Sequence, residues 1–230
     1  MKISNIVAET LNRAILFEQA VKNYQFIEGS SSNPIQDAIN SLKKLADDEG
    51  IAIAIIGGAA AAYHGYPRST KDVDVVVSTT DFHKIMRVSH EYGFVNLSYN
   101  PSKMCEMIYQ HNMSPDVFKL PNGKTVRGVL IEVLEEGMMD VPSPTKMGVV
   151  KGLGFASLKS WIGMKLKAGR MQDLADVVQV LKKTNNEQQQ DIGEYIYDLD
   201  ESLYGQFEWS LDKAKSEQES DPLKNHRYNS

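Results

Sequence analysis

Hydrophobic residues recur along the chain with two periods, and each period predicts a different element. Apolar positions three and four residues apart predict amphipathic helices over residues 3–27 and 34–45, with Asn33 as N-cap and Gly50 as stop signal of the second helix. The nearly continuous apolar run over 51–56 is too short for a core helix and predicts a buried strand. Helices and strands therefore alternate, and we expect an α/β fold.

The stretch IIGGAAAAYHGYPRSTKDVDVVV, residues 55–77, combines an apolar strand, a glycine pair, a short predicted helix and a second strand. Asp72 and Asp74 alternate with valines at the head of that second strand, so both carboxylates point to one face and the valines to the other. Neighbouring carboxylates repel each other, and a cation or a set of donors usually offsets the cost. We expect a divalent metal here, and the structural alternative is pairing with Arg68 and Lys71.

A later strand carries a further acidic residue among apolar neighbours. The pair Asn122-Gly123 predicts a tight turn between a strand near 117–120 and a strand over 124–134, which form a hairpin. Glu132 lies within the second of these strands, where an unpaired charge would be costly. We expect it to share the metal with Asp72 and Asp74. Three other acids remain alternatives for this position: Asp116, Glu135 and Glu136.

The C-terminal half is predicted to be helical. Residues 141–155 are expected to form a long connection, and Lys165 lies on the apolar face of a helix that begins near Ser157. A lysine on an inward face needs an explanation, and the alternative to a functional role is that its amine reaches solvent at the edge of the helix. The expected divisions are an N-terminal helical arm and linker (1–33), a core (34–150), a helical subdomain (151–212) and a disordered tail (213–230).

Composition and charge narrow the function classes. The chain has 230 residues, 42% of them hydrophobic, which suffices for one substantial core. A net charge of −5 argues against general DNA binding. Cys105 is the single cysteine, so neither an internal disulfide nor a thiolate zinc site can form. No signal peptide or long apolar segment is evident, and we expect a cytoplasmic protein without a membrane partner.

The two motif regions together resemble a known superfamily. IGGAAAAYHGYPRSTKDVDVVV resembles the signature of the DNA polymerase β-like nucleotidyltransferases, in which hG[GS], a spacer and [DE]h[DE]h precede a third acidic residue on a later strand. The spacer looks most like the bacterial branch that contains abortive-infection (AbiE-type) toxins. SLKSWIGMKLKAGRMQDLADVVQVL is similar to that branch's K-L-x-A-x-R-x-K-D-x-x-D region. The resemblance spans roughly residues 50–182. It implies a nucleotidyltransferase-fold mixed sheet flanked by helices, with a C-terminal helical subdomain and an N-terminal helix.

The resemblance also implies roles for individual residues. Asp72, Asp74 and Glu132 would ligate Mg²⁺, the implied cofactor, and would form the catalytic set together with Lys165. A second set would bind the NTP: Gly57, Gly58, Arg68, Thr70, Arg170 and Asp173. In this picture Gly57 and Gly58 surround the triphosphate, and Lys165, Arg170 and Asp173 close over the nucleotide.

The implied reaction moves a nucleoside monophosphate from an NTP to a hydroxyl group of an RNA, a protein or a small molecule. An antitoxin or another protein is the implied partner. The chain departs from the family pattern at two positions, because Glu132 stands where Asp is common and Gln172 replaces the lysine before the helix aspartate. These departures favour the competing hypothesis of a catalytically weakened nucleotidyltransferase-fold module that works by binding a partner.

Overall fold

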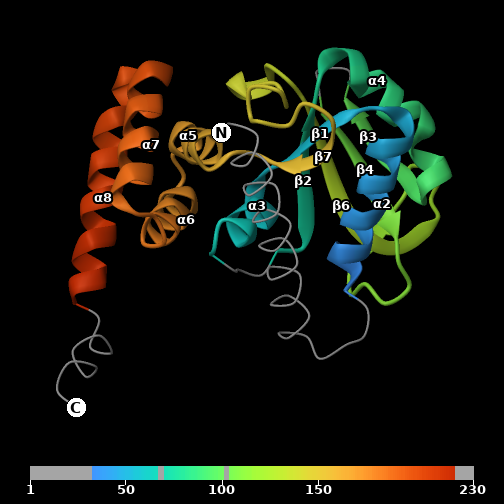
Figure 1. The fold of residues 1–230 in the computed structure, drawn as a ribbon. Coiled ribbons are helices and arrows are strands. Elements are labelled where there is room, and N and C mark those ends of the chain that lie inside the picture. Colours follow the sequence, from blue (N-terminus) through green and yellow to red (C-terminus); the bar gives the residue numbers. More distant parts are fainter. Residues whose placement is uncertain (1–32, 67–69, 101–103, 221–230) are drawn as a thin grey trace, which may run out of the picture. The chain divides into compact units, whose positions relative to one another are not determined.

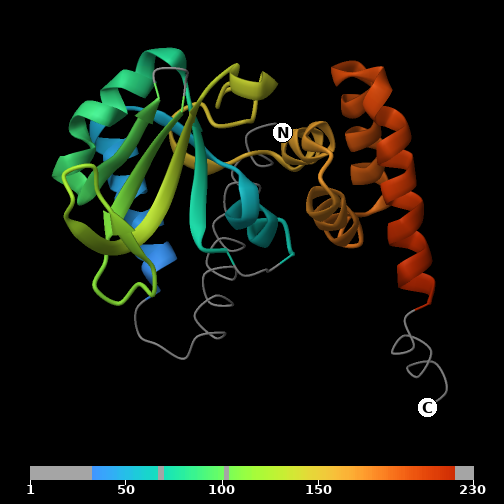
Figure 2. The ribbon, with the colours of Figure 1, turned by 180° about the vertical axis from the view of Figure 1, so that it is seen from behind.

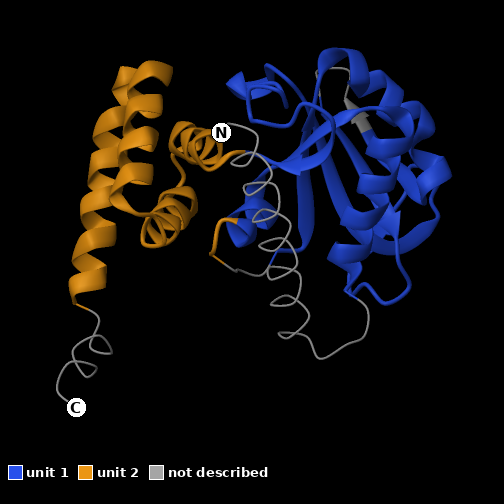
Figure 3. Ribbon diagram, viewed as in Figure 1, with its two compact units in different colours: residues 1–63, 67–156 blue, residues 64–66, 157–230 orange. Residues whose placement is uncertain are grey.

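The computed structural model describes residues 33–66, 70–100 and 104–220 (Figures 1 and 2). The predicted helical arm over 3–27 lies outside these residues. Contacts divide the chain into two compact units: Met1–Tyr63 with Pro67–Ala156, and His64–Tyr66 with Ser157–Ser230 (Figure 3). We describe each unit by itself.

The first unit is a mixed sheet with helices. Its helices are α2 (Pro34–Glu49), α3 (Gly57–Tyr63), α4 (Thr79–Val88) and the 3₁₀ helices η1 (Ser89–Tyr92) and η2 (Met138–Asp140). Its strands are β1 (Ala52–Ile55), β2 (Asp72–Val77), β3 (Phe94–Asn100), β4 (Met104–Gln110), β5 (Val117–Lys119), β6 (Thr125–Glu135) and β7 (Gly152–Phe155). Within the described residues the sheet has seven strands in the order β3-β4-β6-β2-β1-β7, and β5 pairs with β6. The predicted mixed α/β sheet flanked by helices is confirmed.

Strand β2 occupies the position that matters most for function. It pairs antiparallel with β1 and parallel with β6, so the two strands that carry the predicted carboxylates are neighbours. The short helix α3 connects β1 to β2 and lies beside β2 in Figure 2. The predicted sequence of strand, glycines, short helix and strand is thus confirmed, although the structure includes both glycines in α3.

The two faces of β2 differ as its alternating sequence predicts. Val73, Val75 and Val77 are fully buried in a core that also contains residues of α2 and α4. Helix α2 begins at the predicted cap, because the Asn33 side chain accepts hydrogen bonds from the N–H groups of the first turn. It ends at Gly50, which adopts φ of 66° and donates its N–H to a carbonyl of the last turn. Local capping therefore determines where this packing helix begins and ends.

Two parts of the first unit differ from prediction. The sequence does not predict strand β4, because Pro101 and Pro115 on either side of it are typical of a connecting segment. The expected long connection over 141–155 is wrong at its end, where β7 forms and pairs parallel with β1. Its sequence GLGF contains two glycines and shows little strand pattern, so the pairing depends on the neighbouring strand. The first unit accordingly ends at Ala156, whereas the predicted core ended at 150.

The predicted hairpin is confirmed. β5 and β6 pair antiparallel, and Leu120 and Lys124 are joined by a backbone hydrogen bond of 2.8 Å across the Asn122-Gly123 turn. Gly123 has φ of 83°, a conformation that glycine adopts without a steric cost.

The second unit is helical. Its elements are α5 (Leu158–Ala168), α6 (Met171–Leu181), α7 (Asn186–Leu199), η3 (Glu201–Leu203) and α8 (Tyr204–Glu219). α5 packs against α6 and α7, and α8 packs against the same two helices. The helical spacing of Tyr195, Leu199, Leu203 and Phe207 predicts one continuous helix. The structure interrupts it at Asp200, whose extended backbone ends α7 and whose side chain caps η3. Helix α8 extends to Glu219, beyond the predicted start of the tail at 213, and residues 221–230 lie outside the described part.

Among the helices that the structure describes, none combines the length and apolar character needed to cross a membrane.

Candidate active site

The register of β1 and β2 brings Gly57 against Asp74. Ile55 pairs with Val75, and the Ile56 N–H donates to the Asp74 carbonyl at 2.9 Å. The next residue, Gly57, has φ of 60°, and a Cβ atom added there would lie 1.7 Å from Asp74 Oδ2. The position therefore requires glycine for two reasons: the left-handed backbone and the approach of the carboxylate.

The register of β2 and β6 brings Glu132 next to Asp74. Asp74 pairs with Glu132, and side chains of directly paired residues lie on the same face of a sheet. Asp72 lies two residues before Asp74, so it is on this face too. The Thr70 hydroxyl donates to Asp72 Oδ1 at 2.8 Å. The structure thus collects Asp72, Asp74 and Glu132, all half-buried, on two adjacent strands.

A third strand adds an acidic residue that sequence reasoning missed. Glu106 in β4 pairs with Glu132 in β6, so Asp74, Glu132 and Glu106 form a row across β2, β6 and β4. The Ser98 hydroxyl donates to Glu106 Oε2 at 2.7 Å. The signal was present as the alternation Met-Cys-Glu-Met, in which Cys105 is fully buried while Glu106 is half-buried. It was overlooked because β4 itself was not predicted.

The three alternative acids lie elsewhere. Glu135 is an odd number of positions from Glu132 along β6, so it points to the opposite face. Glu136 Oε1 accepts a hydrogen bond from the Thr79 N–H at 3.1 Å, at the start of α4. Asp116 immediately precedes β5, and its backbone carbonyl accepts a hydrogen bond from the Gly128 N–H at 3.2 Å. Only Glu132 among these four pairs directly with Asp74.

The carboxylate row suits Mg²⁺ in the kind of donor it offers. Mg²⁺ prefers oxygen ligands and is commonly held by one or two carboxylates together with waters and substrate phosphates. Over residues 33–66, 70–100 and 104–220, no three His, Cys, Asp or Glu side chains are close enough to form a ready-made metal site. Metal binding by Asp72, Asp74 and Glu132 therefore stays a prediction.

The predicted nucleotide-side residues of the second unit form an ion-pair network in which Lys165 and Asp173 are buried and Arg170 is exposed. Lys165 Nζ lies 2.5 Å from Asp173 Oδ1 and 3.0 Å from Asp176 Oδ2. The Arg170 guanidinium donates to both oxygens of Asp173, at 2.6 and 3.3 Å. Gln172 donates to Asp176 Oδ1 at 2.8 Å. Lys165 is 8% exposed and the two aspartates are almost fully buried, so the alternative that the amine reaches solvent is wrong.

This network changes the ionisation of Asp173. Burial raises the pKa of its carboxyl, but the hydrogen bonds from Arg170 and Lys165 and their charges act in the opposite direction, and the net effect is a lowered pKa. The carboxylate form is thus stabilised inside the helical unit. Lys165 packs against Trp161 as well, with Nζ 5.6 Å from the ring centroid.

The buried position of Lys165 is therefore explained by its ion pairs with Asp173 and Asp176 in the same unit. Nucleotide contacts of Lys165, Arg170 and Asp173 remain predictions, as do those of Gly57, Gly58 and Thr70. Arg68 lies outside the described residues.

Comparisons with known proteins found a solved structure of limited similarity. No protein-family model matches the chain, and no curated protein matches its sequence. A crystal structure of an antigenic nucleotidyltransferase-like protein from Paracoccidioides brasiliensis is similar to the chain with a TM-score of 0.45 and 16% sequence identity. The match covers 77% of this chain and 94% of that chain. Because both the score and the identity are low, we take no functional role from it.

Proposed function

We propose that this protein is a Mg²⁺-dependent nucleotidyltransferase that moves a nucleoside monophosphate from an NTP to a hydroxyl group of an RNA, a protein or a small molecule. One observation carries the proposal: the sheet register sets Glu132 beside Asp74, and Gly57 leaves room for the Asp74 carboxylate. This is the arrangement that the hG[GS]…[DE]h[DE]h signature implies, formed here from three separate segments of the sequence.

In the proposed reaction, Asp72, Asp74 and Glu132 would hold Mg²⁺, with Asp74 paired to Glu132 and Asp72 two residues earlier on β2. Mg²⁺ bound there would neutralise charge on the phosphates and orient the displacement of pyrophosphate. The three carboxylates share one face of the sheet, and Glu132 would help to activate the acceptor hydroxyl by accepting its proton. Thr70 positions Asp72 through its 2.8 Å hydrogen bond.

The NTP would be bound by a second group of residues, to which the superfamily resemblance assigns this role. Gly57 and Gly58 would approach the triphosphate through their backbone, and Lys165, Arg170 and Asp173 would contact the nucleotide as well. We further propose a cytoplasmic role in a toxin–antitoxin system of the AbiE type, with an antitoxin as partner.

Calorimetry with a non-hydrolysable NTP tests the metal site. The wild-type protein should bind the nucleotide with Mg²⁺ and lose this binding in EDTA, and Asp72→Asn with Asp74→Asn should abolish it. A matched control is Asp47→Asn with Asp48→Asn, because these two aspartates are exposed on α2 and each forms an ion pair with a lysine one turn away. Equal nucleotide affinity in EDTA and in the Asp72/Asp74 double variant would show that the proposed metal site is wrong.

A catalytically weakened binding module is the second candidate function. Its support is the position of Gln172, which donates to Asp176 where the family pattern has a lysine, and the presence of Glu132 in place of Asp. Incubation with each labelled NTP and total RNA, and then with candidate proteins, separates the two functions. Transfer of label establishes the enzyme, whereas a stable partner complex without any transfer establishes the binding module.

A further inference from the structure

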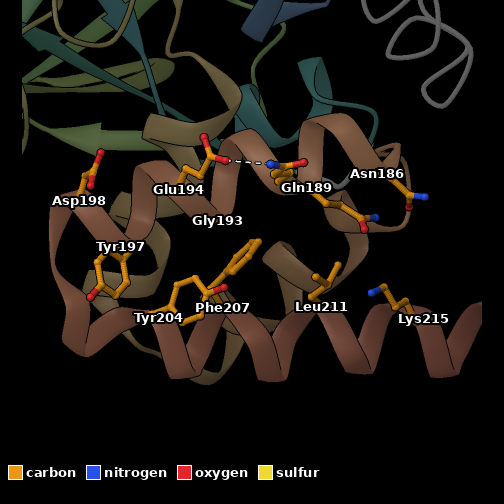
Figure 4. Close-up of a pocket in the computed structure, with 11 residues that line it drawn as sticks. Asn186, Gln189, Gly193, Glu194, Tyr197, Asp198, Tyr204, Phe207, Leu211 and Lys215 are labelled. Atoms are coloured by element: carbon orange, nitrogen blue, oxygen red, sulfur yellow. Dashed lines mark hydrogen bonds between the residues drawn. The ribbon is translucent and has the colours of Figure 1, made fainter.

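Helices α7 and α8 form an open groove in the second unit (Figure 4). Its volume is about 890 Å³, and its lining residues lie between Asn186 and Asp198 on α7 and between Tyr204 and Lys215 on α8. Within the part of the chain that the structure describes, all residues that line the groove belong to these two helices. A small molecule normally needs a concave site that buries most of its surface, so this groove suits an elongated occupant that lies along it.

Three aromatic rings line one end of the groove. Tyr197 and Tyr204 are in edge-to-face contact with ring centroids 5.7 Å apart, and Tyr204 and Phe207 follow at 6.1 Å. Figure 4 shows these rings together, with Leu211 further along α8. Tyr197 is 51% exposed, which is a large fraction for an aromatic side chain at the edge of an apolar surface.

Gly193 makes the floor of the groove possible. A Cβ atom added to it would lie 3.1 Å from Phe207 Cε1, so glycine allows the Phe207 ring to approach the α7 backbone. The aromatic end is thus built from close contact between the two helices. A rigid aromatic surface of this kind is typical of the anchoring centre of a protein interface.

The negative charge of α7 favours an occupant with basic side chains. Four carboxylates lie between Asn186 and Leu199, at Glu187, Asp191, Glu194 and Asp198, and this helix contains neither Lys nor Arg. Glu194 and Asp198 are exposed and line the groove near its aromatic rings, whereas Lys215 of α8 lines the opposite end (Figure 4). Two exposed carboxylates beside the aromatic end of the groove complement a helix that has an apolar face and a basic flank.

We propose that the α7–α8 groove binds a basic amphipathic helix of a partner protein. The apolar face of that helix contacts Tyr197, Tyr204 and Leu211, and its basic flank faces Glu194 and Asp198. The lining part of α7 from Asn186 to Asp198 is about 18 Å long at about 1.5 Å per residue, which matches three to four turns of such a helix. Self-association through this groove is disfavoured, because it would bring two acidic α7 helices together.

This inference does not depend on the proposed function, because the groove lies entirely in the second unit and its test uses no nucleotide. The probe is a fluorescently labelled Leu/Lys peptide with leucines at helical spacing, and binding to the full chain is followed by fluorescence anisotropy. One control peptide has Glu in place of every Lys, and another has a central Pro that breaks the helix.

The protein variants form a matched pair. Glu194→Lys with Asp198→Lys reverses two charges in the groove, whereas Glu208→Lys with Asp212→Lys reverses two exposed charges at the same spacing on α8 outside the lining residues. Circular dichroism confirms that each variant is folded. The first variant should weaken binding of the basic peptide about tenfold at low salt, and the second should leave it within about twofold. Tyr197→Ala should weaken binding as well.

Equal peptide affinity in the two double variants would overturn the proposal, as would equal binding of the acidic or the Pro-containing peptide. Sedimentation velocity addresses the other occupant. Concentration-dependent dimers that Tyr197→Ala dissociates would show that the groove binds a second copy of the chain, and the proposal of a basic partner helix would then be wrong.

Discussion

Substitution of Gly57 by Ala tests the link between backbone conformation and the carboxylate site. The change has two separable effects, because Gly57 has φ of 60° and because the new Cβ atom would lie 1.7 Å from Asp74 Oδ2. The left-handed conformation costs an L-residue about 1–2 kcal/mol. The clash involves the far end of a side chain that can rotate, so we expect the Asp74 carboxylate to move while the fold persists.

A matched control separates the two effects. Gly50 has φ of 66°, and a Cβ atom added there meets nothing within 4 Å. Gly50→Ala therefore introduces the same backbone strain without a clash. At about 2–4 °C per kcal/mol for a chain of this size, both variants should lower Tm by about 2–8 °C.

Calorimetry of Mg²⁺-dependent nucleotide binding provides the decisive comparison. Displacement of a metal-site carboxylate should weaken binding about 10- to 100-fold in Gly57→Ala, the range that altered support of a metal ligand produces. Gly50→Ala should bind like the wild type at a temperature where all three proteins are folded. If the two variants bind the nucleotide equally well, the reasoning that joins Gly57 to Asp74 function is refuted.

Three further predictions concern the ion-pair network and the carboxylate row. Lys165→Met should lower the free energy of unfolding by about 3–5 kcal/mol, because it leaves buried carboxylates without their cation. As a control, Lys159→Met removes one partner of an exposed ion pair and should cost less than about 1 kcal/mol. Similar urea midpoints for the two variants would contradict this reasoning. Because the folded pKa of Asp173 lies below its ordinary value of 3.8, its contribution to stability is complete well above pH 3.8 and is lost as the pH falls through the folded pKa. Urea unfolding over an acid pH series should show this loss, and it should be smaller in Asp173→Asn. Glu106→Gln should stabilise the protein by about 0.2–1 kcal/mol without divalent ions, because it removes a negative charge directly opposite Glu132. This gain in stability should be smaller in Mg²⁺. A lower Tm of the variant in thermal unfolding would argue against repulsion between the carboxylates of the row.

The faces of β2 and the ends of α2 follow from the sequence because they depend on local geometry. Alternation of Asp and Val fixes which side chains share a face, whatever the strand's neighbours are. Asn33 and Gly50 act within one turn of their own helix, so their capping roles can be predicted without knowing the tertiary structure. The same is true of the hairpin at Asn122-Gly123, whose turn residues determine its conformation.

Other features required the tertiary structure because they depend on pairing between distant segments. Periodicity placed Glu132 on a strand but did not choose it over Glu136, and the parallel register of β2 and β6 made that choice. The edge strand β7 has too little pattern to predict, and β1 provides its hydrogen bonds. Glu106 belongs to the carboxylate row only because β4 pairs with β6, and the sequence does not show this pairing.

The sequence by itself determined that two aspartates share a strand face next to a glycine pair, and that a lysine lies on the inward side of a later helix. Only the tertiary structure decided their neighbours: Gly57 and Glu132 for Asp74, and Asp173 and Asp176 for Lys165. The physical reason is that side-chain direction is a local property of helix and strand geometry. Register and ion pairing instead depend on which segments meet, and the packing of the whole unit decides that.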